Sequence, residues 1–215
     1  MKYVLLDLDG TLTNPKLGIT KSVQYALKAY DIIEDDLDNL CKYIGPPLWV
    51  SFKEYHGIKD DQVNDIVEKY REYFSVKGIF ENEAYEGIAE CLEKWKAAGK
   101  ILIVATSKPE VFARQVVEHF GLDEYFTDVC GSTLDGSRST KEEVIRYAIE
   151  KNHITELNQA VMVGDRLHDI EGAKAVGIDS VGVLYGFGSR EELEEYKADK
   201  IAETVDELYD IIMNL

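Results

Sequence analysis

The sequence predicts an α/β fold in which a doubly wound parallel sheet carries an inserted unit made of helices alone. Short apolar runs alternate with amphipathic stretches of helical spacing, and this alternation is typical of a parallel sheet with helices on both faces. After the first apolar run, residues 16–82 show helical patterns and no convincing strand. We therefore expect an α/β core at 1–15 and 83–215, and a small helical cap at 16–82.

The strands of this sheet are expected where the chain is continuously apolar and bounded by turn-forming residues. The run ILIVAT at 101–106 is rich in β-branched residues, as a central parallel strand should be. AVMVG at 160–164 has the same character. The other predicted strands lie at 3–8, 126–132 and 179–186.

Helices are expected between the core strands and throughout the insertion. Pro109 suits the first turn of one helix, and Thr20 and Thr140 are placed as N-caps of two others. A Gly-Pro-Pro turn must end the helix before it. The predicted helical stretches are 20–30, 37–43, 47–55, 60–76, 86–98, 109–119, 140–151, 169–176 and 203–214.

The charge balance of the chain is strongly acidic. The 215 residues include 24 Lys and Arg against 41 Asp and Glu, a formal net charge of −17. A surface of this sign repels a phosphate backbone, which argues against a nucleic-acid polymer as partner. A small anionic substrate at a locally positive site is still compatible with it. We expect a monomer or a weak homodimer.

The cysteines and the hydropathy pattern predict a cytoplasmic protein. Cys41, Cys91 and Cys130 are far apart and form no metal-ligand spacing, which is typical of buried thiols in a reducing compartment. No apolar run is long enough to span a bilayer, and no secretory-type segment is present. We therefore expect no association with membranes.

Acidic side chains follow the apolar runs at the places where strands should end. In VLLDLDGTLT, Asp7 and Asp9 come directly after the first run, and Asp165 and Asp169 follow AVMVG. Ligands of open parallel sheets bind beyond the carboxyl ends of the strands. These four carboxylates are therefore expected to converge on one point, together with Thr106 at the end of ILIVAT.

Converging carboxylates predict a hard cation and phosphoryl chemistry. Carboxylate and carbonyl oxygens suit Mg²⁺, and no Cys/His cluster favours zinc. One carboxylate can attack phosphorus to form an aspartyl-phosphate, and a second can protonate the leaving oxygen and later take a proton from water. Thr106 and Lys141 can hold phosphate oxygens, supported by backbone N–H groups near Gly10 and Thr11.

Each of these features by itself has a plainer explanation. Asp-x-Asp-Gly is most often a turn, and Lys141 beside Glu142 and Glu143 is typical of an exposed helix start. A single threonine at a strand end carries almost no signal. The joint occurrence of these features, in this order and each near a predicted strand end, is what favours a catalytic site.

The same residues resemble the four motifs of the haloacid dehalogenase-like (HAD) hydrolase superfamily. The motifs are DLDGTLT at 7–13, the strand ending in Thr106, Lys141, and GDRLHD at 164–169. The resemblance spans essentially the whole chain and implies a Rossmann-like HAD core. The insertion, with YIGPPLWVSF at 43–52, is similar to the small cap of the phosphoglycolate phosphatase and 5′-nucleotidase branch.

The resemblance implies a role for each motif residue. Asp7 is the nucleophile, and Asp9 is the general acid and base, whose backbone carbonyl also binds Mg²⁺. Its presence favours phosphoryl chemistry, since the dehalogenases of the superfamily lack this second aspartate. Thr106 binds the phosphoryl group, and Lys141 neutralises its oxygens and Asp7. The implied metal ligands are Asp7, Asp9, Asp165 and Asp169.

One motif departs from the pattern of the branch that the chain resembles. The second-motif strand of that branch often ends Thr-Asn-Lys, and here it ends Thr106-Ser107-Lys108. Ser107 still offers a hydroxyl group to the phosphate. Lys108 is a second basic candidate, which either faces the substrate or extends to solvent.

These observations predict a Mg²⁺-dependent phosphomonoesterase for a small phosphorylated metabolite, either phosphoglycolate or a nucleoside 5′-monophosphate. A phosphomutase of the β-phosphoglucomutase type uses the same motifs, and a catalytically idle binding protein can share the fold. The cap is expected to select the substrate. Our hypothesis is that Gly45, Pro46 and Pro47 line the substrate pocket, the alternative being that the prolines only separate two helices.

Overall fold

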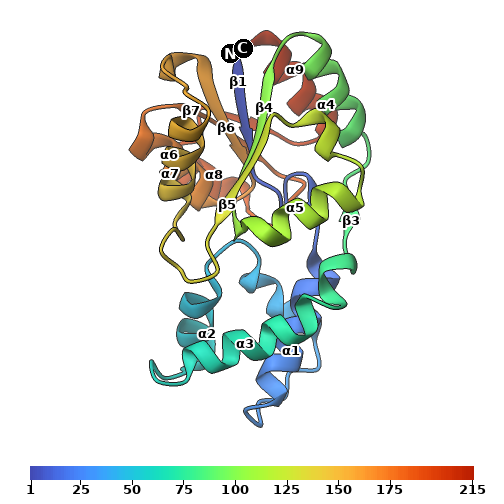
Figure 1. Ribbon diagram of the computed structural model, residues 1–215, viewed down its shortest axis with the longest axis vertical. Coiled ribbons are helices and arrows are strands. Elements are labelled where there is room, and N and C mark those ends of the chain that lie inside the picture. The colour runs from blue at the N-terminus through green and yellow to red at the C-terminus, as the bar shows by residue number, and fades with distance from the viewer. The chain divides into compact units, whose positions relative to one another are not determined.

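The computed structural model describes residues 1–215 and has a six-stranded parallel sheet in the order β5-β4-β1-β6-β7-β8 (Figure 1). This sheet confirms the predicted α/β class, because every predicted core strand is one of its members. Its strands are β1 (Tyr3–Leu6), β4 (Ile101–Pro109), β5 (Asp128–Ser132), β6 (Ala160–Gly164), β7 (Asp179–Val183) and β8 (Lys200–Ala202).

Helices lie on both sides of this sheet (Figure 1). On one face, Leu5, Ile103 and Met162 from three neighbouring strands form a buried cluster with Val144 of α6 and Ala173 of α7. The alternate residues of the strands point to the opposite face. The helices of the core are α4 (Ile88–Ala97), α5 (Glu110–His119), α6 (Lys141–Lys151), α7 (Leu167–Val176), α8 (Arg190–Glu195) and α9 (Val205–Asn214).

The register of the central strands aligns their carboxyl ends. Leu6 at the end of β1 is paired with Val104 of β4 on one side and with Val163 of β6 on the other. The chain leaves β4 for β5 on one side and reaches β7 from β6 on the other, so the strand order reverses at β1. Such a reversal is where open α/β sheets bind ligands.

The chain folds into two compact units, Met1–Asn14 with Ala84–Leu215 and Pro15–Glu83. The second unit is helical and has a core rich in aromatic rings, in which Phe52, Tyr70 and Phe74 are buried. Its elements are α1 (Lys16–Lys28), η1 (Leu37–Tyr43), α2 (Leu48–His56), α3 (Val63–Phe74) and η2 (Gly78–Phe80). Where the chain passes between the units, β2 (Thr13–Asn14) is paired with β3 (Glu83–Ala84).

Of the two helix N-caps predicted from the sequence, one is confirmed and one is wrong. Thr140 caps α6 as predicted: its side chain accepts from the N–H of Glu143, and Glu143 reciprocates in a capping box. Thr20 was wrongly assigned as a cap, because α1 already begins at Lys16 and the Thr20 hydroxyl donates to the Lys16 carbonyl at 2.7 Å. The short elements α8 and β8 were not predicted, since their sequence has no clear apolar period.

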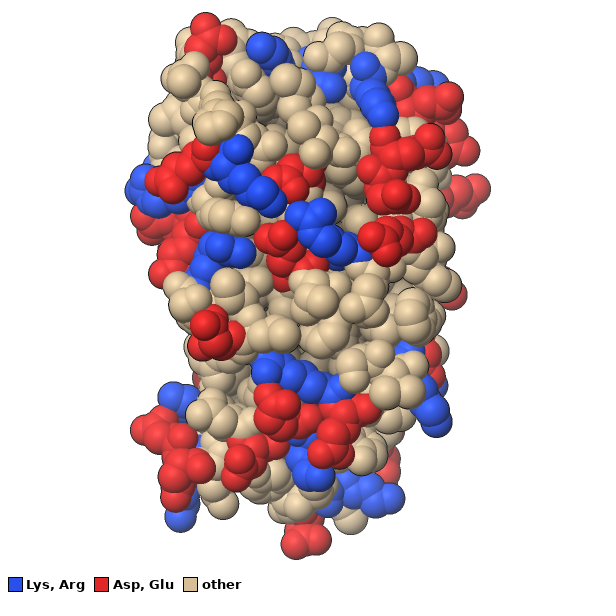
Figure 2. Space-filling model, in the orientation of Figure 1, with Lys and Arg blue, Asp and Glu red and all other residues tan.

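The charged side chains on the face shown in Figure 2 are of both signs, and Lys and Arg are interspersed with Asp and Glu. Some exposed charges form ion pairs; for example, Arg146 contacts Glu142 at 2.9 Å. No helix is both long enough and apolar enough to cross a membrane.

Candidate active site

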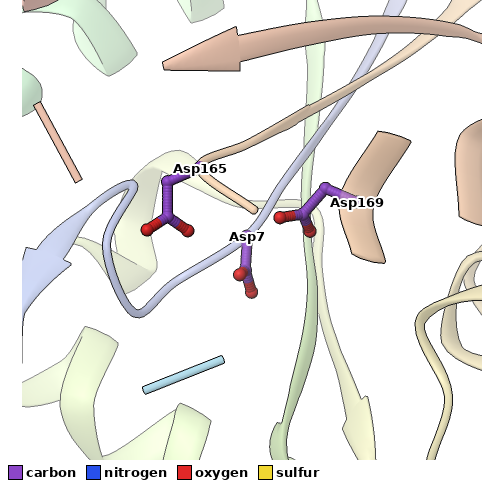
Figure 3. Close-up of side chains that lie close together, drawn as sticks. All are labelled: Asp7, Asp165 and Asp169. Atoms are coloured by element: carbon purple, nitrogen blue, oxygen red, sulfur yellow. The ribbon is translucent and has the colours of Figure 1, made fainter. Parts of the chain in front are cut away.

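Three aspartates converge at the carboxyl edge of the sheet. Asp7 follows β1, Asp165 follows β6, and Asp169 lies in the first turn of α7. The side chain of Asp7 lies between those of Asp165 and Asp169 (Figure 3). One oxygen from each lies within 4.8 Å of the other two. The exposed fractions of the three residues are 5%, 0% and 1%, so water does little to screen their charges.

Lys141 supplies positive charge to this cluster. It is the first residue of α6, and its Nζ lies 2.8 Å from Asp7 Oδ1 and 2.7 Å from Asp169 Oδ1, and donates to the Ala105 carbonyl at 3.1 Å. Burial alone would lower the pKa of Lys141, but the attraction of Asp169 and Asp7 outweighs it and raises that pKa. Lys141 is therefore a buried cation held between two carboxylates.

One cation does not neutralise three carboxylates. Burial, followed by repulsion from Asp169 and Asp7, raises the pKa of Asp165 well above its usual range. Burial also raises the pKa of Asp169 to about 6, against the pull of Lys141. The Oδ1 atom of Asp165 is buried without any hydrogen-bond partner. A hard divalent cation would satisfy this oxygen and relieve the repulsion, so the residues present fit Mg²⁺.

The loop after β7 positions Asp165, and sequence reasoning did not find this. The backbone N–H of Phe187 donates to Asp165 Oδ2 at 2.7 Å. A Cβ atom on either neighbouring glycine would clash: at Gly186 it would lie 2.4 Å from Asp165 Cβ, and at Gly188 it would lie 1.9 Å from the Asp165 carbonyl oxygen. The Gly-Phe-Gly sequence at a strand end was the available signal, because small residues there permit close backbone approach.

Asp9 does not join the acidic cluster with its side chain, so the expected convergence of four carboxylates is wrong for this residue. Its carboxylate instead faces Lys108, whose Nζ donates to Asp9 Oδ1 at 2.9 Å and to Oδ2 at 2.7 Å. Burial raises the pKa of Asp9, and Lys108 opposes that shift. The side chain of Lys108 is 5% exposed and does not extend to solvent.

The other residues predicted near the phosphate lie at the same edge of the sheet. Thr106 is buried, and its hydroxyl oxygen accepts the N–H of Lys108 at 3.2 Å; Ser107 lies between them and is partly exposed. The N–H groups of Gly10 and Thr11 donate to the Thr13 and Leu8 carbonyls within the turn. The phosphate contacts expected of these two N–H groups thus stay a prediction.

The backbone conformation and the close packing at position 10 both require glycine. Its φ of +88° is in the left-handed region, and a Cβ atom there would lie 2.1 Å from Asp165 Oδ2. The adjacent Thr11 is fully buried, and its hydroxyl has no hydrogen-bond partner. The tight turn after Asp9 therefore brings the segment after β1 into direct contact with the segment after β6.

Gly45, Pro46 and Pro47 belong to the unit Pro15–Glu83, where they connect η1 to α2. Gly45 has a φ of +105°, and Pro47 precedes the first residue of α2. They form the predicted stiff turn between two helices. Their contact with a substrate stays a prediction.

Comparisons with known proteins show what this chain is similar to. A 5′-nucleotidase from Pseudomonas aeruginosa is 45% identical over 194 residues, which make up 90% of this chain and 87% of that protein. A tyrosine-protein kinase, PtkA, from Mycobacterium tuberculosis is 35% identical over 96% of this chain and 71% of its own. A phosphoglycolate phosphatase from Vibrio parahaemolyticus is 26% identical over 99% of this chain and 96% of its own.

Among solved structures, that of a predicted phosphatase from Clostridium acetobutylicum superimposes with a TM-score of 0.97 at 50% identity, covering 100% of this chain and 99% of that one. The family model described as haloacid dehalogenase-like hydrolase matches residues 4–183. The chain belongs to this family. Within it, the chain is an enzyme of the phosphatase type.

Proposed function

We propose that this chain is a Mg²⁺-dependent phosphomonoesterase that works through an aspartyl-phosphate intermediate. The observation that carries the proposal is the buried cluster of Asp7, Asp165 and Asp169, with Lys141 between two of its members. Burial of three carboxylates in mutual repulsion costs stability, so it favours a role in binding a cation and a phosphoryl group.

Mg²⁺ would be held by the side chains of Asp7, Asp165 and Asp169, with the backbone carbonyl of Asp9 as the fourth protein ligand that the family resemblance implies. When bound there, the ion supplies positive charge that balances the carboxylates and a phosphoryl oxygen. Phe187 contacts the carboxylate of Asp165, and Lys141 contacts those of Asp7 and Asp169, so all three have a partner in the protein that helps to orient them.

The chain's own residues account for the transfer of the phosphoryl group. An oxygen of Asp7 forms a bond to phosphorus while the bond to the leaving oxygen breaks, and the electron pair of that bond stays on the leaving oxygen. Asp9 gives its proton to that oxygen. Lys141, already beside Asp7, neutralises the phosphoryl oxygens, and Thr106 offers its hydroxyl to them.

The second half of the reaction regenerates the carboxylate. Asp9, now ionised, takes a proton from water as the water oxygen attacks phosphorus. The bond between phosphorus and Asp7 breaks, and inorganic phosphate is released. A phosphomutase would differ in this second half of the reaction. A sugar hydroxyl would attack phosphorus in place of water, and the product would be an isomerised sugar phosphate.

For the substrate we propose a small phosphorylated metabolite, with phosphoglycolate and nucleoside 5′-monophosphates as the first compounds to test. The names of the Pseudomonas and Vibrio relatives support both. We also propose that the helical unit selects between them, with Pro46 and Pro47 in contact with the leaving group. A Pro46→Ala variant should then change the ratio of kcat/KM between substrates more than it changes stability, whereas an equal loss on every substrate would defeat this role.

The test of the proposed function is release of inorganic phosphate from a panel of phosphorylated metabolites, with Mg²⁺ and with EDTA. The wild-type protein should release phosphate only with Mg²⁺, and Asp7→Asn should abolish turnover while leaving the fold intact. Asp210→Asn, the same change at an exposed position of α9, is the matched control and should keep full activity. Full activity of Asp7→Asn would refute the mechanism. A cytoplasmic location and a monomeric or weakly dimeric state stay predictions from the sequence.

A further inference from the structure

Lys108 lies beyond the last regularly paired residue of β4. The pairing of β4 with β5 is regular up to Thr106 and shifts register before Pro109. Within this irregular segment, the N–H of Lys108 donates to the Thr106 hydroxyl at 3.2 Å. On the neighbouring strand, a Cβ atom at Gly131 would lie 2.6 Å from the Lys108 carbonyl oxygen. The backbone at Lys108 is therefore held closely from two sides.

The side chain that this backbone positions is buried against Asp9. Both carboxylate oxygens of Asp9 accept from Lys108 Nζ, and the side chains are only 5% and 12% exposed. The two residues are 99 positions apart in sequence, but Leu6 and Val104 are register partners, so the segments that follow them run side by side. A buried ion pair of this kind restricts the orientation of the carboxylate far more than an exposed one.

The two buried lysines at this edge of the sheet divide the aspartates of the first motif between them. Lys141 contacts Asp7 and Asp169, whereas Lys108 contacts Asp9. Asp7 and Asp9 have different tasks in the proposed reaction, and each has its own cation. This separation suggests that the second lysine serves the proton carrier and not the transferred group.

We infer that Lys108 is a positioning residue that holds the carboxylate of Asp9 where it can protonate the leaving oxygen. The inference rests on the proposed function and deepens it. Before the step, Asp9 is protonated on one oxygen, and its other oxygen accepts from Lys108 Nζ. As the bond from phosphorus to the leaving oxygen breaks, the leaving oxygen takes that proton, and Asp9 becomes the carboxylate whose two oxygens both accept from Lys108 Nζ, as in the structure. Lys108 keeps all of its protons throughout. Lys108 thus acts through Asp9 and does not bind the phosphoryl group.

The dependence of the rate on the leaving group tests this role. p-Nitrophenolate departs without a proton, whereas an alkoxide needs one, so a defect in proton delivery affects alkyl phosphates selectively. In single-turnover measurements with Mg²⁺, Lys108→Met should slow transfer from an alkyl phosphate about 100-fold and from p-nitrophenyl phosphate by less than about threefold. In separate steady-state measurements, the KM of Lys108→Met for either substrate should change little. Lys108→Arg should recover part of the single-turnover rate on the alkyl phosphate.

Lys200→Met, at an exposed position of the edge strand β8, is the matched control and should leave both rates unchanged. Equal losses on the two substrates, or a loss confined to KM, would show that Lys108 binds the phosphoryl group or the rest of the substrate and would overturn the inference.

A double-mutant cycle with Asp9→Asn gives a second, independent test. If Lys108 acts through Asp9, then Lys108→Met in the Asp9→Asn background should change the single-turnover rate by less than about twofold, because the group it positions is already inactive. Losses that multiply would refute the inference. The double variant also removes the buried unpaired carboxylate, so the cycle stays informative even where Lys108→Met alone folds poorly.

The proposed function and this inference fail in different ways. A wild-type protein that releases no phosphate from any monoester in Mg²⁺ defeats the proposed function and, with it, this role of Lys108. An active wild-type protein whose Asp9→Asn variant is selectively slow on alkyl phosphates, but whose Lys108→Met variant is uniformly slow, defeats only the inference about Lys108.

Discussion

Replacing Asp165 with asparagine should stabilise the metal-free protein and abolish its stabilisation by Mg²⁺. Asp165 is fully buried, and one of its oxygens lies within 4.8 Å of an oxygen of Asp7 and of Asp169. Asparagine has nearly the same shape, and its amide oxygen can still accept the N–H of Phe187, which donates to Asp165 at 2.7 Å. The substitution therefore removes a charge and leaves the packing almost unchanged.

The size of the effect follows from the geometry of the cluster. Two unit charges 4.8 Å apart repel each other by about 3.5 kcal/mol at an effective dielectric constant of about 20. Asp165 has two such neighbours, and Lys141 beside them cancels roughly half of their repulsion. The raised pKa of Asp165 means that partial protonation relieves some of the remainder. We expect a net gain of about 2 kcal/mol, or about 5 °C in Tm.

The assay is thermal unfolding near neutral pH, in EDTA and in Mg²⁺. The Tm of the wild-type protein should rise with Mg²⁺, since a ligand that binds only the folded state stabilises it. The Asp165→Asn variant should have the higher Tm in EDTA and the same Tm in Mg²⁺. Glu118→Gln on α5 changes the net charge equally at an exposed position and should behave as wild type. A less stable Asp165→Asn variant in EDTA, or a full response to Mg²⁺, would refute the reasoning.

Four further predictions concern the same edge of the sheet. Because the pKa of Asp169 is raised to about 6, Mg²⁺ must displace a proton below that pH, and its affinity in titration calorimetry should be about tenfold weaker at pH 5 than at pH 7. Between about pH 4 and about pH 6, Asp169 loses its proton more readily in the unfolded state than in the folded state, so the metal-free protein becomes less stable as the pH rises. This contribution should lower the Tm in EDTA over that range. A Mg²⁺ affinity and a Tm that do not change with pH would contradict these two predictions. Gly164→Ala should reduce kcat roughly 100-fold, because a Cβ atom there would lie 2.0 Å from Asp169 Cγ and must displace that carboxylate; wild-type kcat would show that the backbone yields. Thr140→Ala removes the capping box at the start of α6 and should lower the free energy of unfolding in urea by about 1 kcal/mol; no change would mean that packing alone holds this helix start.

Much of the acidic cluster could be predicted because topology restricts where strand ends meet. Asp7 and Asp165 directly follow the two adjacent parallel strands β1 and β6, and Asp169 is one helical turn further along. Any doubly wound sheet with these strands at its centre brings such residues together. The position of Lys141 at a capped helix start is by itself typical of an exposed lysine, so its place in the site could be predicted only from its occurrence together with the other motifs.

The partners of Asp9 and Asp165 could not be predicted in the same way. Asp9 is only two residues from Asp7, but the turn at Gly10 and the bend of β4 carry its carboxylate to Lys108. The Phe187 N–H reaches Asp165 across 22 positions of sequence because the loop after β7 folds back over β6. Both contacts depend on loop paths, which have no period to detect.

The sequence by itself therefore determined the fold class, the order of the motifs and the residue types at the strand ends, because periodicity and turn chemistry are local properties of the chain. Only the tertiary structure decided which charges are neighbours: three carboxylates around Lys141, and the fourth, Asp9, paired with Lys108. The physical reason is that pairing of charges depends on distances of a few ångströms between segments far apart in sequence. Those distances are settled by strand register, by glycines that permit close approach, and by the rotamers that a packed interior allows.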